Sequence, residues 1–170
     1  MTTSLRLRPP LLADEEQFAA AQQGLAKEGF SFCFNFEPAA SWAAHLERLD
    51  AQRRGDGLPA GWVPTTFLVA DVGGRIVGRA SIRHELNDSL LVEGGHIGYA
   101  VLQEHRRRGY ATEILRQSLV LARALGVDRV LVTCDDDNLG SATVIERCGG
   151  RFDSLSRAED GHAVRRYWID

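Results

Sequence analysis

Residues His96 to Thr112 read HIGYAVLQEHRRRGYAT, an apolar segment that leads into a basic turn and then into a helical pattern. A helix that begins directly after such a turn leaves its first backbone N–H groups without intrahelical acceptors, and its dipole places positive charge at the same end. Gly109 has no Cβ, so the backbone can turn tightly there and approach a ligand closely. Together with the three arginines of the turn, these features predict a phosphate-binding site. Neither GxxxxGK nor GxGxxG occurs in the chain, which excludes the two commonest nucleotide-binding loops.

The segments that follow this stretch repeat a strand and helix pattern. From Ala111 to Gly126 the apolar residues recur at helical spacing, and Arg129 to Cys134 is typical of a buried strand. With Ile97 to Val101 these segments form a strand, helix and strand unit. A right-handed crossover through the helix would make its two strands parallel.

The turn Arg106-Arg107-Arg108-Gly109-Tyr110-Ala111 resembles the R/Q-x-x-G-x-G/A pyrophosphate loop of the GCN5-related N-acetyltransferases (GNAT). Ile97 to Val101 looks like the fourth strand of that family, and Asn138 with Ser141 is similar to its N-x-x-[AS] pattern. Within the superfamily the chain resembles the ribosomal-protein alanine acetyltransferase-like branch. It departs from the family at Ile145, where a tyrosine commonly stands as the candidate acid for the departing thiolate.

The resemblance implies one N-acetyltransferase domain over residues 1–170 with an α/β (α+β) fold. The expected sheet is mixed and mostly antiparallel, with about seven strands and four helices, and its parallel strands 4 and 5 splay around acetyl-CoA. Acetyl-CoA is the implied co-substrate, and no metal is expected. The residues implied to bind it, along the strand, in the turn and at the following short helix, are Ala100, Val101, Leu102, Arg106, Arg107, Arg108, Gly109, Tyr110, Ala111, Thr112, Asn138 and Ser141.

Acetyl transfer to an amine needs a neutral amine, so a general base is sought near the implied thioester. His96 stands where related transferases have the glutamate of an E-I-G-Y motif, and the ordinary pKa of histidine, about 6.5, suits the task. The alternative is a histidine hydrogen-bonded inside the sheet. Glu93 is the second candidate and a water held by backbone carbonyls is the third. The resemblance also implies that Asn138 lies beside the thioester, with a helix cap as its alternative role.

The rest of the chain supplies the flanking elements. The segment 29–36 is rich in phenylalanine, and we expect it either to line the acceptor pocket or to pack in the core. The other expected elements are a strand at 4–8, helices at 14–27 and from 41 to before 55, a hairpin of 66–71 with 75–83, an extended approach at 90–92, a short helix opened by Asn138, and a closing hairpin of 152–155 with 164–169.

Composition narrows the function classes. The net charge of −3, with 44% hydrophobic and 25% charged residues, is typical of a globular protein and gives no general attraction to nucleic acid. The three cysteines show no CxxC or metal-ligand spacing, and Asp135 to Asp137 lack the alternation of a calcium loop. No apolar run approaches the roughly 20 residues that cross a bilayer, and MTTSLRLRPP lacks the apolar core of a signal peptide, so we expect a cytoplasmic protein.

The expected function is acetyl-CoA-dependent N-acetyl transfer to a primary amine of a small molecule or a peptide or protein. The alternative is a catalytically silent acyl-CoA-binding module of the same fold, for which Ile145 is the sequence evidence. The expected partner is the amine acceptor, with neither nucleic acid nor membrane. The sequence leaves open the acceptor, the proton donor to the thiolate, and whether the chain is a monomer or a homodimer.

Overall fold

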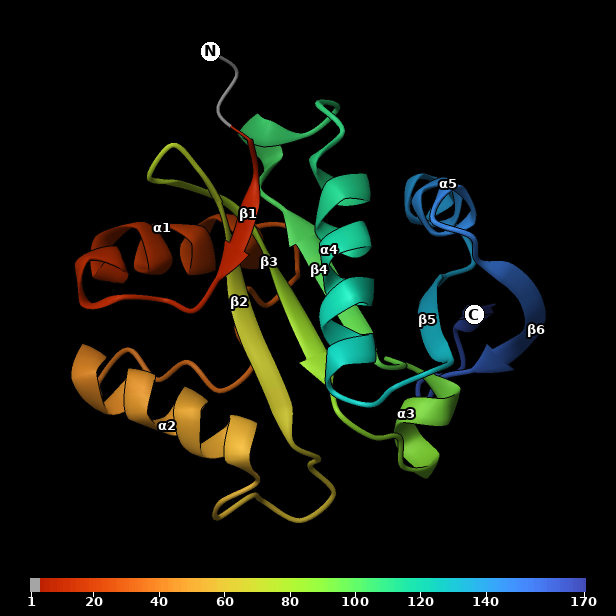
Figure 1. Ribbon diagram of the computed structural model, residues 1–170, viewed down its shortest axis with the longest axis horizontal. Helices are drawn as coiled ribbons and strands as arrows, with labels where there is room; N and C mark the ends of the chain where they lie inside the picture. The colour runs from red at the N-terminus through yellow and green to blue at the C-terminus, as the bar shows by residue number, and fades with distance from the viewer. Residues whose placement is uncertain (1–3) are drawn as a thin grey trace.

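The computed structural model describes residues 4–170 and contains two antiparallel sheets side by side, with helices on both faces of the larger one (Figure 1). The larger sheet has the order β1-β2-β3-β4 and the smaller one β5-β7-β6. The strands are β1 (Arg6–Arg8), β2 (Thr65–Val72), β3 (Arg75–Arg83), β4 (Ile97–Val101), β5 (Val130–Asp135), β6 (Arg151–Arg157) and β7 (Ala163–Ile169). The helices are α1 (Glu15–Ala26), α2 (Trp42–Arg54), α3 (Asp88–Val92), α4 (Tyr110–Ala124) and α5 (Leu139–Arg147).

The predicted α/β class with seven strands is confirmed, and two details differ. The approach expected to be extended at 90–92 is the short helix α3, because the side chain of Asn87 accepts a hydrogen bond from the Leu90 N–H at 2.9 Å and so caps a helical turn. This helix raises the number of α-helices from the expected four to five. The strands β4 and β5, expected as a parallel pair, belong to different sheets.

The helix α4 forms the layer against β3 and β4, while α1 and α2 cover the opposite face of the larger sheet (Figure 1). Its apolar stripe, predicted from the spacing, is buried at Ile114, Leu115, Leu119 and Ala122. No helix in residues 4–170 is both long enough and apolar enough to span a bilayer.

The two sheets are joined where the chain enters β4. The His96 N–H donates to the Leu131 carbonyl at 2.8 Å, and the Leu131 N–H donates to Nδ1 of the His96 ring at 2.9 Å. Gly95 makes this approach possible, since a Cβ at that residue would lie only 2.4 Å from the Leu131 oxygen. The positive φ of Gly95, 59°, also favours glycine at this position.

An aromatic cluster fills the core between α1, α2 and the segment 29–36. His45, with 1% of its surface exposed, lies among the rings of Phe18, Phe36 and Trp42, each with its centroid 5.3 Å away. Neither ring nitrogen of His45 has a hydrogen-bond partner. Burial lowers the pKa of His45 to about 4, so the ring is neutral at pH 7.

The substitution His45→Phe should reduce the sensitivity of the fold to acid. In the wild type, the unfolded state binds a proton at His45 near pH 6.5 and the folded state only near pH 4, so this residue removes stability as pH falls through that window. The difference in unfolding free energy between the variant and the wild type should be constant above pH 7.5 and should grow in favour of the variant from pH 6.5 to 4. Urea denaturation at a series of pH values measures it. A difference that does not change with pH would contradict this account.

Candidate functional site

Beyond the His96 to Leu131 contact, a cavity of about 470 Å³ opens between the two sheets. Gly98 and Tyr99 of β4 lie on one side, Thr133 and Asp135 of β5 on the other, and the start of α5 closes one end. Exposed aromatic side chains of the segment 29–36 lie over it, at Phe30 and Phe34, while Phe32 and Cys33 are buried. The expected core packing is therefore seen at Phe32 and Cys33, while Phe30 and Phe34 line a cavity whose role as the acceptor pocket stays a prediction.

The backbone groups of β4 alternate between the larger sheet and the cavity. The Arg83 N–H donates to the His96 carbonyl, and the Leu102 N–H donates to the Val77 carbonyl. In an antiparallel ladder this pattern turns the even-numbered residues of β4 toward β3 and the odd-numbered ones away from it. Ala100 and Leu102, expected to bind the pantetheine arm, therefore have their backbone groups committed to β3. The groups that face the gap are those of Tyr99 and Val101.

The turn before α4 has the geometry of an anion site. Arg107 and Gly109 have positive φ values of 62° and 80°, and no side chain caps the N-terminus of α4. Alternation of left-handed and right-handed residues turns successive N–H groups toward one point, where the helix dipole adds positive charge. A Cβ at Gly109 would meet no atom within 4 Å, so the space in front of these donors is open. These residues fit a phosphate group.

The three arginines of the turn differ in their hydrogen bonds and in their exposure. Arg106 holds the turn in place, because its Nε donates to the Val101 carbonyl at 3.0 Å and its other nitrogens form a two-bond ion pair with Glu28 at 2.7 and 2.9 Å. Arg107 and Arg108 are exposed, and Arg108 donates to the Glu104 carbonyl. These three bonds leave two of the five guanidinium N–H groups of Arg106 for a further acceptor.

The helix α5 begins at the other side of the cavity. The side chain of Asn138 caps it by accepting from the Ser141 N–H at 3.0 Å, and Ser141 Oγ forms a 2.7 Å hydrogen bond with the phenol of Tyr99. Burial raises the pKa of Tyr99, so the phenol keeps its proton. Ile145 is fully buried in the core and does not line the cavity.

His96 is 7% exposed and does not line either cavity described here. Because its Nδ1 accepts from the Leu131 N–H, the neutral ring carries its proton on Nε2 and has no free lone pair. Burial, with a smaller effect from the charge of Arg83, lowers the pKa of His96. This geometry favours the structural role of His96 over the expected role of general base.

Glu93, the second candidate, does line the cavity and stands in a small charged cluster. His162 Nε2 lies 3.4 Å from Glu93 and 3.2 Å from Asp135, while its Nδ1 lies 2.5 Å from Asp160. The bond to Asp160 is the main reason that the pKa of His162 is raised. Ligand atoms of Glu93, Asp135 and His162 lie within 4.8 Å of one another, so they could also hold a metal ion. The expected absence of a metal stays a prediction.

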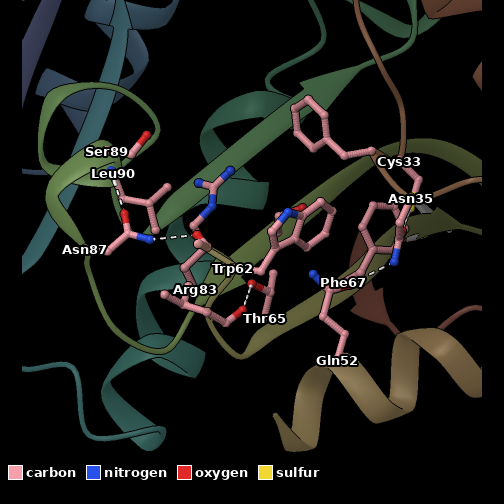
Figure 2. A pocket seen from close by; sticks show the side chains of 14 residues that line it. Cys33, Asn35, Gln52, Trp62, Thr65, Phe67, Arg83, Asn87, Ser89 and Leu90 are labelled. Atoms are coloured by element: carbon pink, nitrogen blue, oxygen red, sulfur yellow. Dashed lines mark hydrogen bonds between the residues drawn. The ribbon is translucent and has the colours of Figure 1, made fainter. Parts of the chain in front are cut away.

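A second cavity of about 280 Å³ adjoins the first, with Phe34, Arg83 and Leu90 in the lining of both. Figure 2 shows Arg83 extending between Leu90 and the indole of Trp62. The Asn87 amide donates to the Gly61 carbonyl at 2.8 Å and so ties α3 to the loop that carries Trp62.

Tyr99, Arg79 and Arg83 line the main cavity, and the sequence reasoning did not identify them as site residues. The two arginines did leave a signal. They stand four residues apart in RIVGRASIR, on the same face of a strand whose other residues are nearly all buried. A charged side chain on the inward face of a central strand is unusual without a partner.

The comparisons with known proteins agree with this architecture. A family model described as an acetyltransferase (GNAT) domain matches residues 4–151. The chain is similar to the uncharacterized N-acetyltransferase YjdG of Bacillus subtilis (strain 168), with 33% identity over 96 residues, and the match spans 55% of this chain and 51% of that protein.

Two solved structures share the fold. RimJ of Mycobacterium smegmatis, in complex with CoA-disulfide, has a TM-score of 0.70 at 20% identity, over 97% of this chain and 81% of that one. The structure of yncA from Salmonella typhimurium with its cofactor acetyl-CoA has a TM-score of 0.65 at 14% identity, over 98% and 93% of the two chains. Because the family model matches most of its length, the chain belongs to the GNAT acetyltransferase family.

Proposed function

We propose that this protein is an acetyl-CoA-dependent N-acetyltransferase that acts on a primary amine of a small molecule or peptide. The observation that carries the proposal is the open cleft between β4 and β5, which has an uncapped helix start at one end and a polar cavity at the other. The turn residues 107–112 would hold the pyrophosphate through backbone N–H groups. Tyr99 and Val101 would bond the pantetheine arm. A cytoplasmic location is part of the proposal.

The residues of the cavity can meet the chemical needs of the transfer. When bound, acetyl-CoA supplies the acetyl thioester, and the amine nitrogen forms the new C–N bond as the C–S bond breaks. The carboxylate of Glu93 accepts the proton that the amine loses. The phenol of Tyr99 stabilises the departing thiolate by donating a hydrogen bond, since burial keeps Tyr99 protonated. Tyr99 thereby takes the role of the tyrosine that commonly stands at position 145 in the family, where this chain has an isoleucine.

A catalytically silent acyl-CoA-binding module is the second candidate, because Ile145 is buried away from the cleft. Thiol release from acetyl-CoA, followed over a panel of polyamines, amino acids, aminoglycosides and peptide N-termini, separates the two. Amine-dependent release supports the enzyme. Tight acetyl-CoA binding with no release for any amine supports the silent module.

Gly109→Val should abolish acetyl-CoA binding. A valine there is strained at a φ of 80° and puts a side chain into the open space before the helix start. Gly126→Val is the matched control, because Gly126 has a φ of 89° and equal space but lies after the opposite end of α4. Calorimetric titration with acetyl-CoA should give loss of binding only in the Gly109 variant. Equal affinity in the two folded variants would refute the loop assignment.

His96→Asn and His96→Ala should separate a structural role from a catalytic one. Asparagine can accept the Leu131 N–H bond through Oδ1 but cannot take up a proton near neutral pH, whereas alanine leaves that buried N–H unsatisfied. We expect the alanine variant to lose about 1–3 kcal/mol of stability and the asparagine variant to keep most of its stability and its kcat/KM. Thermal unfolding and steady-state rates measure both. A fall of kcat/KM by about 100-fold or more in a stable asparagine variant would restore His96 as the base.

Glu93→Gln should slow transfer to lysine-like amines more than transfer to α-amines. Near pH 7 the deprotonation of an amine of pKa about 10.4 costs about 4.6 kcal/mol, against about 1 kcal/mol for a pKa near 7.8. We expect kcat/KM to fall by about 10²- to 10⁴-fold for the first class and by less for the second. Glu159→Gln, in the exposed β6 to β7 turn, is the control. Identical pH profiles for wild type and Glu93→Gln would assign the proton transfer to water.

A further inference from the structure

Two arginines of β3 lie side by side against the main cavity. Arg79 and Arg83 are four residues apart, so their side chains leave the same face of the strand. Both approach Gly98 of β4, because a Cβ built there would be 3.2 Å from a terminal nitrogen of Arg79 and 3.8 Å from one of Arg83. The missing side chain at Gly98 thus gives both guanidinium groups room beside the cavity.

Neither arginine has an acidic partner. None of the ion pairs within residues 4–170 includes Arg79 or Arg83. Arg79 is 7% exposed, donates one long bond to the Ser31 carbonyl at 3.3 Å, packs 6.0 Å from the centre of the Phe34 ring, and has an Nε without a partner. Arg83 donates to the carbonyls of Gly94 and Gly95.

Two neighbouring buried guanidinium groups without a counter-charge destabilise the ligand-free protein. Burial and the charge of Arg83 lower the pKa of Arg79 to about 10, so both groups remain cationic at pH 7 and repel each other. A buried charge normally has an opposite charge beside it. The acids of the same cavity, Glu93 and Asp135, already face the imidazole of His162. Both guanidinium groups are therefore left without an acidic partner among the described residues and are available to an anionic ligand.

We propose that the acceptor amine of this transferase carries a carboxylate, which binds between Arg79 and Arg83. This inference rests on the proposed acetyl transfer and narrows its acceptor. Guanidinium groups bind carboxylates through paired hydrogen bonds. A phosphate would also suit two arginines, but Glu93 and Asp135 line the same cavity and would repel its second charge.

The position of the anion site beside the candidate base favours an α-amino acid. Arg83 is bonded to Gly94 and Gly95, Glu93 directly precedes them, and Arg83 and Glu93 line the same cavity, which suits an acceptor whose carboxylate and amine are neighbours. The adjoining cavity of about 280 Å³ shares Arg83 with the main one and offers Trp62 and Phe67 to an apolar side chain.

The test compares acceptors that share a side chain and differ in the group beside the amine, with rates measured across pH so that differences in amine basicity are separated from binding. Leucine and phenylalanine are each assayed beside the amide, the decarboxylated amine and the aminophosphonic acid, by thiol release from acetyl-CoA. We expect kcat/KM for the free acid to exceed that of the amide and the amine by 100-fold or more, mainly through KM. Equal rates for acid and amide would overturn the proposal. Preference for the phosphonic acid would assign the site to a phosphate-like group instead.

Variants then connect the preference to the arginines. Arg79→Gln should raise the KM for the free acid at least 10-fold and leave the amide unchanged. Gly98→Ala should do the same through a Cβ that displaces the Arg79 guanidinium, and it leaves the charge count intact. Arg75→Gln, exposed at the start of the same strand, is the matched control. Retained acid preference in folded Arg79→Gln and Gly98→Ala proteins would refute the site.

A binding measurement separates this inference from the proposed function. Calorimetric titration of the wild type with leucine and leucinamide in the presence of CoA requires no turnover. Selective binding of leucine with no acetyl transfer would refute the transferase and keep the anion site. Transfer to amines with no selective binding of leucine would keep the transferase and refute the anion site.

Discussion

The hydrogen bonds between His96 and Leu131 are the contact on which the site depends. They join a four-stranded and a three-stranded sheet at the point where β4 begins, and beyond them the two strands separate. A neutral imidazole suits this position, because its Nδ1 completes the bonding of a backbone N–H that would otherwise be buried without a partner. The separation of β4 from β5 in turn leaves the backbone groups of Tyr99 and the N–H of Val101 without a neighbouring strand, while the Val101 carbonyl accepts from Arg106.

Charge is distributed unevenly along the resulting cleft. The uncapped start of α4 supplies positive potential at one end, and Arg79 with Arg83 supplies it at the other. Among the acids between the sheets, Glu93 and Asp135 face His162, and Asp136 pairs with Arg165 at 2.7 Å. A cleft with two separate cationic regions suits two reactants that each carry an anionic part.

Much of the fold followed from local patterns in the sequence. The helical spacing of α4, the glycine in the turn before it and the cap of α5 by Asn138 each depend on residues close in the chain, which explains why they could be predicted. The site depends on residues far apart. His96 meets Leu131 across 35 positions and Arg79 meets Ser31 across 48, and no local pattern reports such pairs. The sequence left His96 open between a base and a histidine bonded inside the sheet, and only the fold shows that it bridges the two sheets and that the buried arginines lie beside the cavity.

Gly95 controls the distance between the two sheets at the point where the cleft begins. Its absent side chain sets how closely the two sheets approach at their junction, since a single carbon there would overlap the Leu131 carbonyl. From that junction, β4 runs about 17 Å to its end, at roughly 3.3 Å per residue. A small change in the angle between β4 and β5 at the junction therefore produces a larger change in the distance between the two strands at the far end of β4. The absence of a Cβ at Gly95 thus helps to set the width of the space between the sheets.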